Sequence, residues 1–74
     1  MTVEVRLFAS FRNGRFKMKD VETEAGYSVG DVLGKLEIPV AEVGILMVNG
    51  ESAAFERTLA AGDVLAVFPA VGGG

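Results

Sequence analysis

The start of the chain alternates between apolar and polar residues. Val3, Val5 and Leu7 are separated by polar residues, and this period of two predicts a strand. Residues 12–15 contain an Asn-Gly pair, which supplies the positive φ that a tight hairpin turn needs. A second strand is expected after this turn. Its inward residues are expected to be Phe16 and Met18, and its outward residues Lys17 and Lys19.

A short helix is predicted between Tyr27 and Ile38. Ser28 is a suitable N-cap, and Asp31 three residues later forms a carboxylate variant of the capping box. The following apolar residues recur at the spacing of one helix face. They are Val29, Val32, Leu33 and Leu36. Pro39 should end the helix, because the residue before a proline disfavours helical geometry.

The second half of the chain predicts three more strands. Residues 45–48 form a continuous apolar run that leads into an Asn-Gly turn, and residues 51–55 read as a short return strand. Residues 61–63 form another turn. Residues 64–68 form the last apolar strand, which a proline stops.

This order of elements predicts an α+β fold of the β-grasp type, with a mixed sheet and one short helix packed on one of its faces. The first and last strands would be parallel neighbours at the centre of the sheet, which suits their apolar character. We expect one domain over residues 1–74, with a flexible C-terminal tail at residues 69–74.

The predicted sheet has more apolar residues than one short helix can cover. We therefore expect a partner-binding surface, since contiguous exposed apolar patches mark interaction sites. Its expected members are Phe8, Leu46, Phe68, Pro69 and Val71. Loops folding over the uncovered face are the alternative.

Composition narrows the classes of function. The 74 residues include no Cys and no His, which excludes disulfides, Cys/His zinc sites and Cys–His or Ser–His nucleophilic machinery from this chain alone. The net charge of −3 argues against general nucleic-acid binding. No apolar run approaches the ~18 residues of a membrane span, and no secretory signal is recognisable, so we expect a cytoplasmic protein.

Charge is unevenly distributed along the chain. Most of the bases lie in the first nineteen residues, as Arg6, Arg12, Arg15, Lys17 and Lys19, whereas acids dominate from Asp20 to Asp63. A solvated face is the ordinary explanation for the bases, and a docking patch is the alternative. Glu22 and Glu24 could chelate a metal weakly, but solvated carboxylates explain them better, so no metal site is expected.

The chain ends in Gly72, Gly73 and Gly74. Three glycines lose much backbone entropy on ordering and add nothing to the stability of a small domain. A frayed end is the plain explanation. The alternative is that another protein handles the terminal carboxylate, because a tail without Cβ atoms can slide through a narrow channel and leaves its carbonyl open to attack.

These features together resemble the MoaD/ThiS family of ubiquitin-like sulfur carriers. The resemblance spans essentially the whole chain: Leu7-Phe8-Ala9, the turn at 49–50, the stretch from Leu59 to Val64, and above all residues 68–74. Phe8, Arg12 and Phe68-Pro69 match the small subunits of molybdopterin synthase, although Ala70 stands where a second proline is usual and the helical region is short.

The resemblance implies a function. An E1-like enzyme would use ATP to adenylate the Gly74 carboxylate, with Gly73 completing the motif, and a persulfide donor would convert it to a thiocarboxylate. The carrier would then deliver sulfur to a large synthase subunit in molybdopterin synthesis. It would have no active site and no bound cofactor of its own.

Other pathways and classes stay open. A thiamine-type carrier, or a carrier for tungsten cofactor, cysteine or tRNA thiolation, would use the same tail. A ubiquitin-like modifier would instead form isopeptide bonds with lysines. A plain binding module would not need Gly73 and Gly74 at all.

Overall fold

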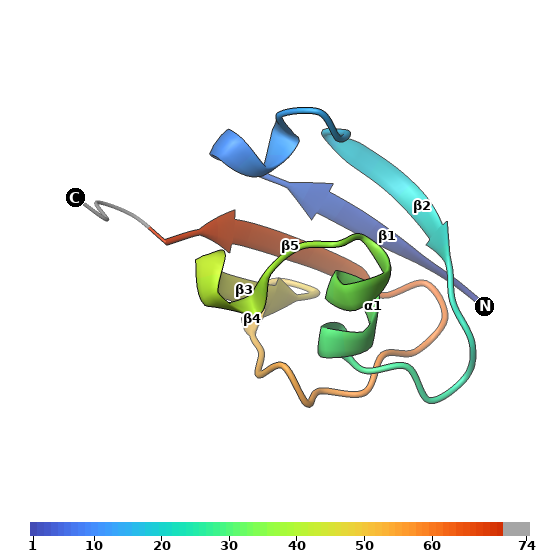
Figure 1. The fold of residues 1–74 in the computed structure, drawn as a ribbon. Coiled ribbons are helices and arrows are strands. Elements are labelled where there is room, and N and C mark those ends of the chain that lie inside the picture. Colours follow the sequence, from blue (N-terminus) through green and yellow to red (C-terminus); the bar gives the residue numbers. More distant parts are fainter. Residues whose placement is uncertain (71–74) are drawn as a thin grey trace.

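The computed structural model describes residues 1–70 and contains five strands, one α-helix and two 3-10 helices (Figure 1). In chain order they are β1 (Thr2–Leu7), η1 (Ala9–Arg12), β2 (Met18–Glu22), α1 (Val29–Lys35), η2 (Val40–Glu42), β3 (Val43–Val48), β4 (Glu51–Ser52) and β5 (Val64–Pro69). Within the described residues, no helix is long and apolar enough to cross a membrane.

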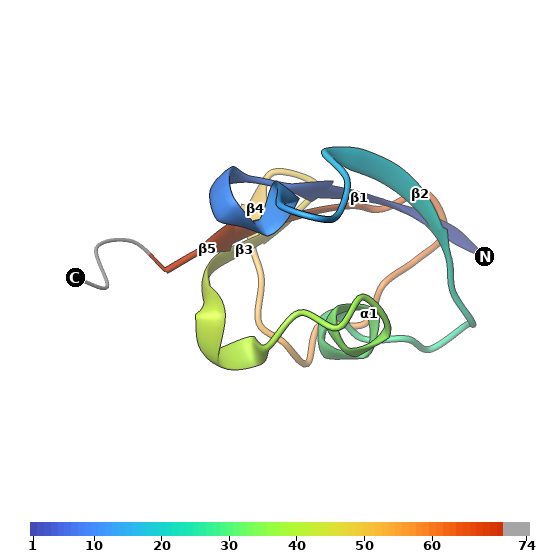
Figure 2. The ribbon, with the colours of Figure 1, turned by 45° about the horizontal axis from the view of Figure 1, so that its top comes forward.

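The strands form one mixed sheet in the order β2-β1-β5-β3-β4. β1 and β5 run parallel at its centre, and the other neighbouring strands are antiparallel. Figure 2 shows the sheet as one layer, with α1 as a second layer against one of its faces. The predicted β-grasp fold and its central parallel pair are therefore confirmed.

The core lies between α1 and the face of the sheet turned toward it, which we call the inner face. Alternate residues of the three central strands are buried there, because successive side chains of a strand point to opposite faces. These are Val3, Val5, Leu7, Leu46, Val48, Leu65 and Val67. The helix adds Val29, Val32 and Leu33. Each such side chain stabilises the fold by about 1.5–3 kcal/mol through burial.

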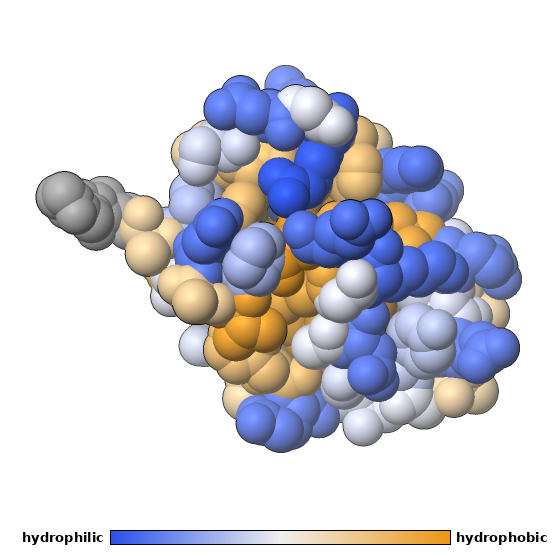
Figure 3. Space-filling view, in the orientation of Figure 1, coloured by the Kyte–Doolittle hydropathy of each residue, from blue (hydrophilic) through white to orange (hydrophobic). Residues whose placement is uncertain are grey.

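Helix α1 begins with the predicted capping box. The Ser28 hydroxyl accepts a hydrogen bond from the Asp31 N–H at 3.1 Å, and the Ser28 N–H donates to the Asp31 carboxylate at 2.9 Å. The helix ends at Lys35, so it is too short to cover the whole inner face. Figure 3 accordingly shows apolar surface in the middle of this side, between hydrophilic residues.

The connection after β1 differs from the predicted hairpin. Residues 9–12 form η1, and only then does the chain turn, with the Arg15 N–H donating to the Arg12 carbonyl at 3.1 Å. Asn13 has φ −66° and Gly14 has φ +70°, which is type II geometry. Gly14 thus supplies the positive φ, but Asn13 does not, and the link is longer than a tight hairpin.

Two expected side-chain orientations are wrong. Met18 was expected inward, yet it is 58% exposed, because it pairs with Arg6 and so shares the face opposite the helix. Leu46 was expected in the partner-binding surface, yet it is only 5% exposed, because it pairs with the buried Val67. Ile45, one position earlier, takes the outward place and is 52% exposed.

The later turns follow the prediction more closely. Asn49 and Gly50 both have positive φ, of 53° and 82°, as the hairpin between β3 and β4 requires. The return strand is only Glu51–Ser52, shorter than the expected residues 51–55. β5 continues through Pro69, which therefore belongs to the sheet rather than to a tail.

Candidate partner-binding surface

The face of the sheet opposite α1, which we call the outer face, carries a second set of apolar side chains. Strand pairing arranges them in rows across the sheet. In one row Phe68 of β5 pairs with Ile45 of β3, and in the next Ala66 pairs with Met47 and with Arg6 of β1. The described residues place no helix over this face (Figure 2).

Two aromatic side chains form the centre of the outer face. The rings of Phe8 and Phe68 are stacked, with centroids 4.2 Å apart and planes 8° from parallel. The Arg12 guanidinium lies over the Phe8 ring, 5.1 Å from its centroid. The Arg12 Nε donates a hydrogen bond to the Leu7 carbonyl at 2.7 Å. Both rings remain partly exposed, so the expected exposure of Phe8 and Phe68 is confirmed.

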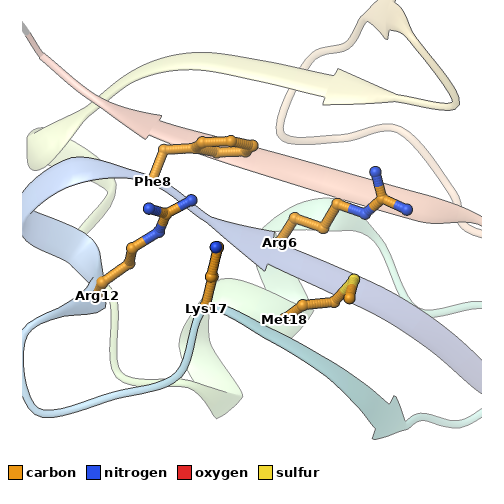
Figure 4. A pocket seen from close by; sticks show the side chains of 5 residues that line it. All are labelled: Arg6, Phe8, Arg12, Lys17 and Met18. Carbon is orange, nitrogen blue, oxygen red and sulfur yellow. The ribbon is translucent and has the colours of Figure 1, made fainter.

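A groove opens beside this stack. Its volume is about 400 Å³, and its lining residues are Arg6, Phe8, Arg12, Lys17 and Met18, which we call the basic groove. Figure 4 shows Arg12 and Lys17 extending toward the space beside the Phe8 ring, with Arg6 and Met18 on the other side of Lys17. The groove combines an aromatic wall, a thioether and three cationic heads.

The end of β5 is held against the segment that leads into β3. The Ala70 N–H donates to the Glu42 carbonyl at 2.9 Å, and Pro69 pairs with Val43, beside a register irregularity at Gly44. A Cβ atom at Gly44 would lie 2.7 Å from the Ala70 Cα and 2.8 Å from the Pro69 carbonyl oxygen. Glycine at position 44 is thus what lets the chain leave β5 along this path.

The expected site residues Val71, Gly73 and Gly74 lie outside the described residues, and so does Gly72. Of the expected partner-binding residues, the structure brings together Phe8 and Phe68, and it places Pro69 at the end of the same strand. Whether these residues bind a partner stays a prediction.

The start of β5 is fixed by a polar network. The Asp63 carboxylate accepts hydrogen bonds from the Ala60 N–H at 2.8 Å and the Asn49 side-chain amide at 2.9 Å, and Asn49 in turn accepts one from the Val64 N–H. The bond from the Ala60 N–H, followed by the Asn49 amide, lowers the pKa of Asp63 below its usual value.

A second carboxylate at the edge of the sheet is also held in its charged form. The pKa of Glu22 is lowered, first by the hydrogen bond from the Thr2 hydroxyl and then by the N-terminal ammonium. Neither Glu22 nor Asp63 lines the basic groove. Among residues 1–70 no group of three acids could hold a metal ion.

Sequence reasoning missed several residues of this surface. Met18 was predicted to point inward, and Ile45 was not among the expected partner-binding residues. Lys17 was predicted as an outward residue of the basic cluster, for which a docking patch was the alternative. The signal for Ile45 was weak, because residues 45–48 are all apolar and show no alternation.

Comparison with known proteins places this geometry in a family. No curated protein sequence matches the chain significantly. Among solved structures, SAMP1 from Haloferax volcanii is 31% identical over the whole of both chains, with a TM-score of 0.79. A putative molybdopterin converting factor, subunit 1, from Pyrococcus furiosus is 29% identical over 96% of this chain and 99% of that one, with a TM-score of 0.77.

A further structure shows the same fold at lower identity. It is the complex of subunits 1 and 2 of molybdopterin-converting factor from Helicobacter pylori, 20% identical over the full length of both chains, with a TM-score of 0.68. The family model for the Mut7-C ubiquitin matches residues 1–72. The chain therefore belongs to the Mut7-C ubiquitin family, as a small ubiquitin-like protein of the MoaD and SAMP type.

Proposed function

We propose that the protein is a sulfur carrier in the synthesis of molybdopterin. An E1-like enzyme adenylates the Gly74 carboxylate with ATP, and a persulfide donor supplies the sulfur that turns it into a thiocarboxylate. The carrier binds both this enzyme and, afterwards, a large sulfur-accepting subunit through the outer face, with Phe8 and Phe68 as its aromatic anchors. Such buried aromatic anchors dominate the binding energy of many interfaces.

One observation carries this proposal. The glycines at 72–74 follow β5 in the sequence after only two residues, and β5 carries Phe68 of the Phe8–Phe68 stack just before its end. A docked partner would therefore contact the outer face and receive the glycines at the same time. The likeness to subunit 1 of a putative molybdopterin converting factor, and to a subunit 1 solved together with its subunit 2, supports the pathway and the partner.

The proposed chemistry begins with activation of the terminal glycine's carboxylate. A carboxylate resists nucleophiles, whereas its mixed anhydride with AMP has a good leaving group. The terminal sulfur of a persulfide attacks the carbonyl carbon, AMP leaves, and a second thiol cleaves the resulting acyl disulfide to release the thiocarboxylate. Both the persulfide and the second thiol belong to partner proteins or solutes, since this chain has no Cys.

The test is the intact mass of the protein. The proposal requires that the mature protein ends at Gly74 and that incubation with ATP, an E1-like enzyme and a persulfide donor replaces one oxygen atom by sulfur. A variant lacking Gly73 and Gly74 should fold with unchanged stability, because an exposed terminus contributes little, and should never gain sulfur. An unmodified mass with every E1-like enzyme of the source organism would contradict the proposal.

A second function is favoured by a specific likeness. SAMP1 is a small archaeal modifier protein, and two of its structures match this chain. A modifier would use the same activated carboxylate to acylate lysines of other proteins. Conjugates of higher mass on a blot of cell extract, lost when Gly73 and Gly74 are deleted, would show this function. Their absence beside a thiocarboxylate would leave the carrier function alone.

A further inference from the structure

We propose that the basic groove receives an acidic side chain of the partner protein that docks on the outer face, and that this contact selects the partner. The proposal rests on the proposed function only in taking a protein as the partner of this face. It concerns Arg6, Arg12 and Lys17, which lie outside the Phe8–Phe68 stack and outside the glycine tail.

The charges in the groove are available to a partner. Within residues 1–70, no carboxylate lies within ion-pair distance of Arg12 or Lys17, and Arg6 pairs only with the half-buried Glu4. The Arg12 Nε donates to the Leu7 carbonyl, and the guanidinium lies over the Phe8 ring. These two contacts fix the orientation of the guanidinium. An ordered guanidinium loses less entropy when it binds a carboxylate.

The groove also contains apolar surface that only a macromolecule would cover. Met18 is the most exposed large hydrophobic residue of the part that the structure describes. It lies in one row with Arg6 across the β1–β2 pair, beside the Phe8 wall of the groove. A partner segment with a carboxylate between apolar side chains would match this surface in both charge and hydrophobicity.

Other anionic ligands fit less well. Nucleic acid would be repelled by the rest of the surface, because acids outnumber bases in a chain of net charge −3. A small anion such as phosphate would leave Met18 and Phe8 uncovered. Complementary charge at an interface mainly steers encounter and excludes wrong partners, which is the role that a carrier with several possible acceptors needs.

The experiment is an NMR titration of the ¹⁵N-labelled protein with an acetylated and amidated hexapeptide of alternating Glu and Leu. The Gln–Leu hexapeptide is the control for charge. Lys17→Glu and Lys19→Glu form a matched pair of variants: they are two residues apart and change the net charge equally, but Lys19 lies over Phe16, outside the groove. The same pair is then compared as substrates of the activating enzyme.

We expect the Glu–Leu peptide, and not the Gln–Leu peptide, to shift the amides of β1, η1 and the start of β2. Lys17→Glu should weaken that binding and the kcat/KM of adenylation about fivefold, and Lys19→Glu less than twofold. Raising the salt concentration from about 50 to about 300 mM should weaken the affinity of the wild-type protein for the Glu–Leu peptide toward that of Lys17→Glu.

Three results would overturn the inference. Equal effects of the two variants would mean that net charge, and not the groove, matters. Equal shifts with inorganic phosphate would make the groove a small-anion site, and tighter binding of a single-stranded oligonucleotide would make it a nucleic-acid site. The peptide titration needs no sulfur chemistry. If sulfur transfer failed while Lys17→Glu still weakened peptide binding, the proposed function would be rejected and this inference would stand.

Discussion

The two faces of the sheet are built from the same strands and yet serve opposite purposes. On the inner face, Leu65 and Val67 of β5 are fully buried against the helix. On the outer face, Phe68 of the same strand stacks on Phe8 and stays partly exposed. One residue of offset along a strand thus separates a side chain that stabilises the fold from one that is available to a partner.

The difference shows that a very small domain can leave one face of its sheet out of the core. Apart from Phe11 and Thr23, the buried side chains are aliphatic, and they fill the thin layer beneath a helix of seven residues. The outer face concentrates aromatic, thioether and guanidinium groups, which are the groups enriched in interfaces. A sheet that needed both faces for stability would have a second layer of helices. Here the second face remains open within the described chain.

The largest effect should come from the inner face. Leu65→Ala removes a fully buried side chain at the centre of the sheet, so the free energy of unfolding should fall by about 3 kcal/mol. Urea denaturation followed by circular dichroism measures this loss. A loss below about 1 kcal/mol would mean that the inner face is not the main source of stability.

The next effect concerns the point where the chain leaves the sheet. Gly44→Ala places a Cβ atom against the Ala70 and Pro69 backbone, so stability should fall by about 2 kcal/mol and the amide signals of residues 42–44 and 69–70 should shift. Gly34→Ala is the control, since its Cβ meets nothing within 4 Å, and it should stabilise helix α1 by up to about 1 kcal/mol. If both variants gained stability, the close approach at Gly44 would not be real in solution.

A smaller loss of stability is expected on the outer face. Phe8→Leu keeps an apolar side chain but removes the stack on Phe68 and the Arg12 contact, and should cost about 1 kcal/mol. Its binding to the activating enzyme should weaken about tenfold, as for an interface anchor. Denaturation and adenylation kinetics on the same sample separate the two effects. A loss of stability as large as that of Leu65→Ala would contradict the distinction between an inner face that stabilises the fold and an outer face that is available to a partner.

The smallest effect should be that of a partly exposed carboxylate, Asp63. The pKa of Asp63 is lower in the folded state than in the unfolded chain, so its contribution is present above the unfolded pKa and is lost as the pH falls through the folded pKa. Asp63→Asn should therefore cost less than about 1 kcal/mol at neutral pH and nothing in acid. Thermal melts of both proteins across the acid range measure this convergence. Parallel curves would show that the carboxylate charge is not involved.

The sequence was sufficient for the architecture because local signals agreed with one another. The alternation in β1, the capping box at Ser28 and the Asn-Gly turn at 49–50 each determined an element whose place in a β-grasp fold left no alternative order. The central pairing of β1 with β5 followed from their apolar character.

The orientation of some side chains could not be predicted. Leu46 lies in a run of four apolar residues, so nothing in the run distinguishes the inner face from the outer one, and only the pairing of Leu46 with Val67 decides it. Met18 begins β2, an edge strand. Because η1 lengthens the connection from β1, the alternation of β1 does not predict which face Met18 points to. The bases of the basic groove could be predicted as a cluster near the start of the chain, but only the fold shows that Phe8 and Met18 lie beside them.

The parallel pairing of the first strand with the last has a consequence for how the molecule is made. β1 gains its central neighbour only when residues 64–69 have been synthesised, so the decisive contact has the longest sequence separation in the fold. A nascent chain lacking that segment would leave β1 and β3 without the strand that joins them. Folding can therefore be completed only after β5 has been synthesised, and every folded copy already possesses the strand that leads to its glycines.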